Sequence, residues 1–120
     1  MNVLIVEDDK VLSLLLSKMI ERLDYKVVGT YSKGSDAIKK AKELVPDLVL
    51  MDIMLEDDID GIEATLEFQK SNKTSKVIYI TGNSDSYNRD RANATEFVDY
   101  LVKPVSIDDL KSSINKIPFN

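Results

Sequence analysis

The sequence contains no cysteine, no histidine and no tryptophan. Without cysteine the chain forms no disulfide and offers no thiolate nucleophile or thiolate metal ligand, a composition that fits a reducing cytoplasm. Without histidine it has no imidazole for zinc binding, for acid–base catalysis or for a Ser-His-Asp triad. Carboxylates, amines, hydroxyls and backbone groups remain to carry chemistry.

Glycine and proline are also scarce, with 4 and 3 residues in a chain of 120. Hydrophobic residues at 43% and charged residues at 31% are typical of a folded protein, and this length predicts one domain over residues 1–120. No apolar run approaches the roughly 20 residues that cross a bilayer, and no basic segment precedes the first apolar run. We therefore expect a cytoplasmic protein without a membrane segment.

Positive charge is in the minority, because 16 basic residues face 21 acidic ones and leave a net charge of −5. The basic residues form no block along the chain. Direct binding to nucleic acid or to a membrane surface is therefore not expected.

Short apolar runs alternate with stretches of helical period. The continuous run Val3–Val6 is typical of a strand buried on both faces, and the spacing of apolar residues between Lys10 and Leu23 predicts an amphipathic helix that Asp9 would cap. The same reasoning predicts further strands over 26–31, 48–51, 77–80 and 97–102 and further helices over 34–44, 61–70, 84–94 and 107–117. Ser106 would cap the last helix, and 84–94 is expected to be the least stable element. This alternation predicts a doubly wound α/β fold with a parallel sheet.

Ligands bind beyond the carboxyl ends of such a sheet. Glu7 and Asp8 follow the first strand, Asp52 ends the third, Thr81 ends the fourth and Lys103 follows the fifth. Taken singly, each has an ordinary explanation as a cap, a solvated turn or a strand residue. Asp52 lies in an otherwise apolar run, however, where a carboxylate is costly to bury without a partner. The joint placement favours a functional site.

Crowded carboxylates constrain the chemistry of that site. Two like charges roughly 4 Å apart repel by about 4 kcal/mol at an effective dielectric near 20, and a divalent cation removes this repulsion. All-oxygen ligands suit Mg²⁺, with Mn²⁺ as an alternative. A lysine and a hydroxyl can hold phosphoryl oxygens, and an aspartate can act as the nucleophile. The arrangement predicts that Asp52 accepts a phosphoryl group.

The ordered set of motifs resembles the response-regulator receiver domain of two-component signalling, a CheY-like family. The motifs are Glu7-Asp8, Asp52, Thr81-Gly82 and Lys103-Pro104, and the resemblance extends over essentially the whole chain. Each motif alone is weak, whereas the set in this order and spacing is specific. The resemblance implies a flavodoxin-like sheet of five strands in the order 2-1-3-4-5 with five helices.

The resemblance also implies roles around the acceptor. Asp52 corresponds to the phosphoacceptor, Asp8 to a direct Mg²⁺ ligand, Glu7 to a ligand acting through water, and Met54 to a residue whose backbone carbonyl binds the metal. The loop from Asp52 to Asp60-Gly61 departs from the family because it lacks the usual proline and is one residue longer.

Further roles concern the response to phosphorylation. Thr81 would bond the phosphoryl group, Lys103 would pair with it, and Tyr100 corresponds to a switch aromatic, although a half-buried strand aromatic is the ordinary explanation. The side chains of Met54 and Asn83 would modulate attack of water on the acyl phosphate. The segment 94–97 replaces the small-residue turn that is common in the family.

The resemblance implies a signalling domain, not an enzyme with turnover, that promotes its own phosphorylation and dephosphorylation. Its partners would be a histidine kinase or phosphotransfer protein and an unknown output partner or output domain, reached through the fourth helix, fifth strand and fifth helix. The first strand begins next to Met1, which favours a native N-terminus. The chain would be a stand-alone regulator or the receiver of a longer one.

The main alternative is a binding module, either a degenerate receiver or a flavodoxin, that no longer takes phosphate. An aspartate-based phosphohydrolase and a calcium loop are further alternatives. A flavodoxin needs a Ser/Thr/Gly-rich loop after the first strand, and an aspartate-based phosphohydrolase needs an Asp-x-Asp pattern there; the acidic residues 7–9 fit neither. A calcium loop is suggested by the acidic and glycine positions Glu56, Asp58, Asp60, Gly61 and Glu67. Against it, Glu63 stands where an apolar residue is expected, and a strand precedes the loop.

Overall fold

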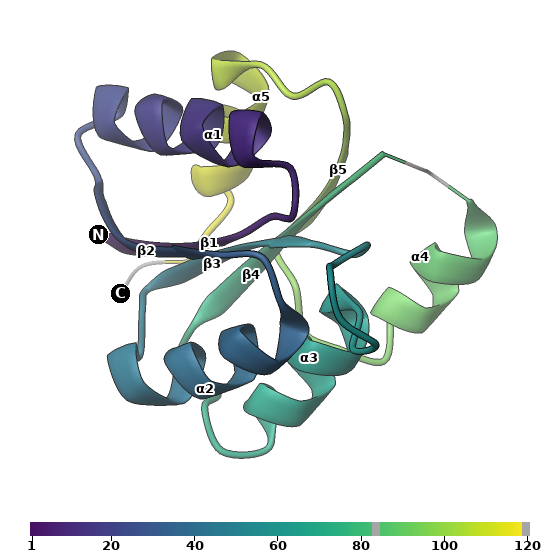
Figure 1. The fold of residues 1–120 in the computed structure, drawn as a ribbon. Coiled ribbons are helices and arrows are strands. Elements are labelled where there is room, and N and C mark those ends of the chain that lie inside the picture. Colours follow the sequence, from purple (N-terminus) through teal and green to yellow (C-terminus); the bar gives the residue numbers. More distant parts are fainter. Residues whose placement is uncertain (83–84, 119–120) are drawn as a thin grey trace.

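The computed structural model describes residues 1–82 and 85–118. Five parallel strands form one sheet in the order β2-β1-β3-β4-β5 (Figure 1). The strands are β1 (Asn2–Val6), β2 (Lys26–Tyr31), β3 (Leu48–Asp52), β4 (Lys76–Thr81) and β5 (Asp99–Val102). The helices are α1 (Lys10–Arg22), α2 (Gly34–Leu44), α3 (Gly61–Gln69), α4 (Ser86–Ala92) and α5 (Ile107–Ile114). The predicted flavodoxin-like, doubly wound α/β fold is confirmed.

Helices cover both faces of the sheet, with α1 and α5 on one side and α2 and α3 on the other (Figure 1). Alternate residues of β1 serve the two layers: Leu4 and Val6 belong to the core under α2 and α3, whereas Val3 and Ile5 belong to the core under α1 and α5. Two-sided burial explains why this strand reads as a continuous apolar run.

The predicted caps are present. The Asp9 carboxylate accepts hydrogen bonds from the backbone N–H groups of Val11 at 2.9 Å and Leu12 at 3.1 Å. Ser106 accepts from the backbone N–H of Asp109 at 3.1 Å, and the Asp109 carboxylate accepts from the N–H of Ser106 in return. These side chains satisfy backbone donors that the first turn of a helix leaves unpaired, so the helices begin where the sequence predicts.

The last helix ends earlier than predicted. α5 stops at Ile114, and the N–H of Ile117 donates to the carbonyl of Ile114 at 3.0 Å in a tighter turn. Ile117 is nevertheless buried in the core under α1 and α5. Its helical spacing in the sequence therefore reflects packing and not continued α-helix.

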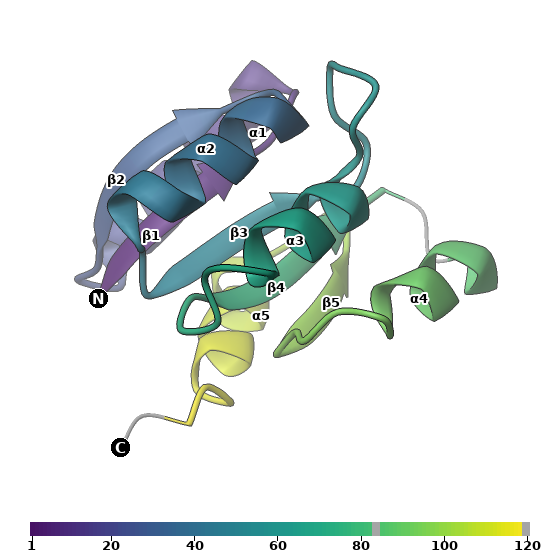
Figure 2. The ribbon, with the colours of Figure 1, turned by 90° about the horizontal axis from the view of Figure 1, so that it is seen from below.

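α4 is shorter than the predicted 84–94 and contributes one buried side chain, Ala92. It begins at Ser86, and the carboxylate of the N-cap residue Asp85 accepts from the N–H of Asn88 at 2.7 Å. Figure 2 shows α4 beyond α3, at the β5 end of the sheet.

Among the helices of residues 1–82 and 85–118, none combines the length and the hydrophobicity that a membrane span requires.

Candidate functional site

Three acidic side chains meet at the carboxyl edge of the sheet. Carboxylate oxygens of Glu7, Asp8 and Asp52 lie within 4.8 Å of one another. β1 and β3 are neighbours with Val6 opposite Met51, so the residues that follow them are brought side by side. Glu7 and Asp52 are buried, with 3% and 2% of their surface exposed, and Asp8 is exposed.

Lys103, the residue that follows β5, completes the cluster. Its Nζ lies 3.0 Å from Asp52 Oδ2 and 3.0 Å from Glu7 Oε1. The backbone N–H of Lys103 donates to the carbonyl of Thr81 at 2.8 Å, which extends the β4–β5 pairing by one residue and fixes the start of the lysine side chain. One ammonium group therefore faces three carboxyl groups.

The crowding changes the protonation of these groups. Burial, together with the neighbouring carboxyl groups of Asp52 and Asp8, raises the pKa of Glu7 to about 8. Burial also raises the pKa of Asp52, while hydrogen bonds from Glu7 and Lys103 oppose that rise. Burial would lower the pKa of Lys103, but its contacts with Glu7 and Asp52 outweigh this and raise it. A proton on Glu7 and the charge on Lys103 thus reduce the repulsion in the metal-free cluster.

Two buried carboxylate oxygens point to a cation. Asp52 Oδ1 and Glu7 Oε1 accept no hydrogen bond from the described residues, although Glu7 Oε1 keeps its ionic contact with Lys103. A buried oxygen without a donor is costly. Hard divalent cations prefer such oxygens, so the donor set fits Mg²⁺ and also admits Mn²⁺. Within the described ranges, this is the one group of three acidic residues close enough to hold a metal ion.

The loop between β3 and α3 returns to the strand end. The backbone N–H of Gly61 donates to the carbonyl of Ile53 at 2.8 Å. A Cβ at position 61 would overlap the carbonyl oxygen of Asp52, so glycine is required there. The Met54 side chain, two residues after Asp52, is exposed at 67%.

The calcium-loop alternative is not supported by these contacts. Asp60 forms a capping box with Glu63 at the start of α3 and pairs with Arg91 at 2.8 Å. Glu67 pairs with Lys70 at 2.9 Å on the same helix. Both acidic side chains thus have structural partners that a calcium ligand would have to give up.

A family model for the response regulator receiver domain matches residues 3–115. The chain belongs to this family. The response regulator protein VraR of Staphylococcus epidermidis is 36% identical over 116 residues, which is 96% of this chain and 55% of that protein. The chain therefore spans about half the length of the curated relatives it matches.

Solved receiver domains share the fold. The signal receiver domain of a modulated diguanylate cyclase from Desulfovibrio desulfuricans G20 aligns with a TM-score of 0.87 and 36% identity, covering 95% of this chain and 90% of that chain. The receiver domain of the sensor histidine kinase PA1611 from Pseudomonas aeruginosa aligns with a TM-score of 0.85 and 28% identity, covering 96% and 94%. That structure holds a magnesium ion coordinated in its active-site cleft.

Tyr100, the predicted switch aromatic, is buried and not half-buried, with 5% of its surface exposed. Its hydroxyl makes no hydrogen bond with the described residues. The Arg89 guanidinium lies 4.7 Å from the centre of its ring, and the Tyr79 ring lies 6.1 Å away. Thr81 is buried at the end of β4 on the same edge as the cluster. Asn83 lies outside the described residues.

The sequence did not predict a pair of buried hydroxyl groups, on Tyr79 and Thr95, that holds the end of α4. The Tyr79 and Thr95 hydroxyls are 2.8 Å apart, and Thr95 Oγ1 donates to the carbonyl of Ala92 at 2.7 Å. These two contacts hold Thr95, which is buried, within the segment 94–97 that departs from the family pattern. The two hydroxyls are 16 residues apart in the sequence, so no local spacing could have indicated the pair.

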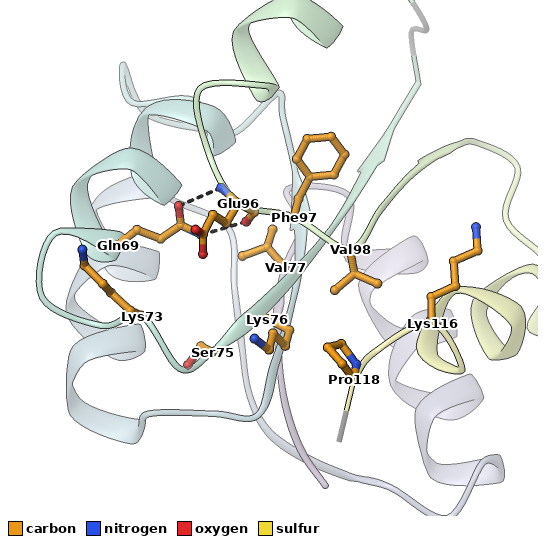
Figure 3. A pocket seen from close by; sticks show the side chains of 10 residues that line it. All are labelled: Gln69, Lys73, Ser75, Lys76, Val77, Glu96, Phe97, Val98, Lys116 and Pro118. Carbon is orange, nitrogen blue, oxygen red and sulfur yellow. Dashed lines mark hydrogen bonds between the residues drawn. The ribbon is translucent and has the colours of Figure 1, made fainter. Parts of the chain in front are cut away.

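A cavity of about 330 Å³ lies at the other end of β4, next to the start of that strand. Figure 3 shows Gln69 reaching over the backbone of Glu96: the Gln69 amide donates to the Glu96 carbonyl at 2.8 Å and accepts from its N–H at 3.2 Å. The lining includes Lys73, Lys76 and Lys116. It shares no residue with the acidic cluster, so the cavity is separate from the candidate site.

Proposed function

We propose that this receiver domain, residues 1–120, accepts a phosphoryl group on Asp52 from a histidine kinase or phosphotransfer protein and so acts as a switch. The observation that carries the proposal is the state of the Asp52 carboxylate. It is buried, one oxygen contacts the Lys103 ammonium at 3.0 Å, and the other accepts no hydrogen bond from the described residues. It is thus an oriented carboxylate with one oxygen available for chemistry.

In the proposed transfer, a carboxylate oxygen of Asp52 attacks the phosphorus of a phosphohistidine. An O–P bond forms as the N–P bond breaks, and the imidazole of the donor leaves with the electron pair of that bond. Lys103 holds Asp52 in place before transfer and can pair with the phosphoryl oxygens afterwards. Thr81, at the end of the neighbouring strand, would bond the same oxygens.

Glu7, Asp8, Asp52 and the backbone carbonyl of Met54 would hold Mg²⁺ or Mn²⁺ at this edge. A bound cation would neutralise charge on the phosphoryl oxygens. The support is the 4.8 Å cluster, the buried Asp52 Oδ1 that accepts no hydrogen bond from the described residues, and the magnesium ion in the active-site cleft of the PA1611 receiver domain.

The surface beside the acceptor suits a helical phosphodonor. α1 exposes Val11, Leu14 and Leu15 at helical spacing, with 79%, 61% and 49% of their surface accessible. Val11 lies in the first turn of α1, directly after the acidic residues of the cluster. An apolar strip that begins directly after the acidic residues of the cluster would let a partner protein dock while its phosphohistidine reaches the carboxylate.

Phosphorylation would be read out through Thr81 and Tyr100 at α4, β5 and α5. Switching elements come from the least stable parts of a fold, and α4 buries only Ala92 among its seven residues. The output partner, the cytoplasmic location and the modulating roles of Met54 and Asn83 stay predictions.

Intact mass after incubation with acetyl phosphate and Mg²⁺ tests the proposal. We expect the mass of one phosphoryl group to be added per chain, to disappear in Asp52→Asn and to persist in Asp58→Asn, a matched change at an exposed position of the same loop. Addition to the Asp52→Asn variant would overturn the proposal. Continued turnover of a small phosphoester would favour a phosphohydrolase instead.

A further inference from the structure

The N-terminus of α2 is capped by a residue from another loop. Lys33, at the N-cap position, makes no capping hydrogen bond with its side chain among the described residues. Instead Asp57 supplies the acceptors: Oδ1 accepts from the N–H of Gly34 at 2.9 Å, and Oδ2 accepts from the N–H of Ser35 at 3.1 Å and from its hydroxyl at 2.8 Å. Asp57 belongs to the β3–α3 loop, 23 residues further along the chain than Gly34.

Two neighbouring contacts tie the same loop to the start of α2. The backbone N–H of Glu56 donates to the carbonyl of Ser32 at 3.1 Å. Gly34 lies against the backbone of Ile59 so closely that a Cβ at position 34 would overlap the Ile59 carbonyl oxygen. The loop therefore rests on the β2–α2 junction along the stretch from Glu56 to Ile59.

These contacts matter because the sequence of the loop itself does little to fix its conformation. Residues 53–60 contain no proline and four acidic residues, which repel one another and the acidic cluster nearby. Slight burial would raise the pKa of Asp57, but hydrogen bonds from the Ser35 hydroxyl and from the Ser35 and Gly34 amides outweigh it and hold this pKa below its ordinary value. Asp57 thus stays charged at a helix N-terminus, where backbone donors and the helix dipole favour an anion.

Met54 lies between the two places at which the loop is fastened. On one side the carbonyl of Ile53 accepts from the N–H of Gly61, and on the other side Glu56 and Asp57 bind the start of α2. We propose that Asp57 is a positioning residue: by capping α2 it holds the loop in the shape that presents the Met54 carbonyl to the cation. This inference rests on the proposed function, since it assumes that the carbonyl is a metal ligand.

Mg²⁺ binding to the full chain, measured by titration calorimetry, tests the proposal. We expect Asp57→Ala to weaken Mg²⁺ binding about tenfold, as loss of a group that orients a metal ligand does. Asp58→Ala removes the same charge from the exposed neighbouring position and should bind Mg²⁺ as the unaltered protein does. Asp57→Asn keeps one acceptor oxygen and should restore part of the affinity. Ser35→Ala removes one of the three hydrogen bonds and serves if Asp57→Ala fails to fold.

Amide hydrogen exchange of the metal-free protein separates the possible failures. Faster exchange at Glu56 and at Gly34 and Ser35 in the Asp57 variants is expected if the loop is released. A lowered melting temperature with unchanged Mg²⁺ affinity would make Asp57 a helix cap only and overturn the proposal. If the unaltered protein binds no Mg²⁺, the metal site itself is refuted. The exchange data then still show whether Asp57 holds the loop against the start of α2.

Discussion

Arg91 of α4 pairs with Asp60, the N-cap residue of α3, at 2.8 Å. The other carboxylate oxygen of Asp60 accepts from the N–H of Glu63 at 2.9 Å, so one side chain both starts α3 and holds α4. Asp60 precedes Gly61, whose N–H binds the carbonyl of Ile53 just after the proposed acceptor. The pair therefore links the proposed readout helix to the loop that borders the candidate site.

The first prediction concerns this ion pair. Arg91→Gln should speed amide exchange in α4 and lower the free energy of unfolding by about 0.5–1 kcal/mol, because both side chains are partly accessible to water. Arg22→Gln changes the charge equally at an exposed site on α1 and should leave α4 unaffected. Equal exchange of α4 in both variants would show that other contacts hold the helix.

A second prediction concerns the Tyr79–Thr95 hydrogen bond. Tyr79→Phe and Thr95→Val each remove one hydroxyl from a buried pair, and a double-mutant cycle should give a coupling of about 1 kcal/mol. Urea unfolding of the two single variants and the double variant measures it. Strictly additive losses would mean that the two hydroxyls contribute independently.

The Arg91–Asp60 and Tyr79–Thr95 contacts could not be predicted from the sequence, whereas local features could. The strand Val3–Val6 and the caps Asp9 and Ser106 were predictable because strand burial and capping are local patterns. The acidic cluster was predictable because parallel strands bring their carboxyl ends to one edge.

Contacts between distant loops carry no such local signal. Asp57 reads as one of several acidic loop residues, and only the folded chain brings it to the start of α2. α4 was predicted too long because Ala94 reads as an apolar contact of the helix, whereas Ala94 is exposed and Thr95 is buried against Tyr79 as the chain turns towards β5. Tertiary packing decided both cases.

A third prediction follows from Glu7 in the metal-free protein. Burial, together with the neighbouring carboxyl groups of Asp52 and Asp8, raises its pKa from the ordinary 4.5 to about 8 in the folded chain. Between these values the folded state holds a proton that the unfolded chain has released, so the free energy of unfolding should fall as pH rises from 4.5 towards 8.

Urea unfolding in the presence of a chelator, repeated across this pH window, measures the slope. Glu7→Gln should flatten it, while Glu21→Gln, an exposed change on α1, should retain it. The prediction fails if the stability of the unaltered protein is constant over the window or rises with pH.

The fourth prediction concerns Mg²⁺ and stability. Magnesium at a hundred times its dissociation constant should stabilise the folded chain by about 2.7 kcal/mol. Asp8→Asn should lose most of this stabilisation because the variant lacks one of the three clustered carboxylates. Thermal unfolding with and without Mg²⁺ provides the measurement, with Asp58→Asn as the control for a lost charge. Equal responses of the two variants would contradict the proposed ligand set.

A fifth prediction concerns the lifetime of the proposed acyl phosphate. The exposed Met54 side chain offers no hydrogen-bonding group that could orient a water molecule near Asp52. Met54→Asn should therefore speed dephosphorylation, followed as loss of the added mass after removal of the phosphodonor. Met54→Leu should behave like the unaltered protein. An unchanged rate in Met54→Asn would refute the idea.

Every side chain of β3 is buried between the two helical layers, whereas α4 buries one. The proposed acceptor therefore belongs to the most constrained strand, and the proposed readout helix tolerates far more substitution. Exposed positions of α4 such as Ser86 and Asp90 are therefore the places to recruit a new effector, provided that Arg89 and Arg91 keep their contacts with Tyr100 and Asp60.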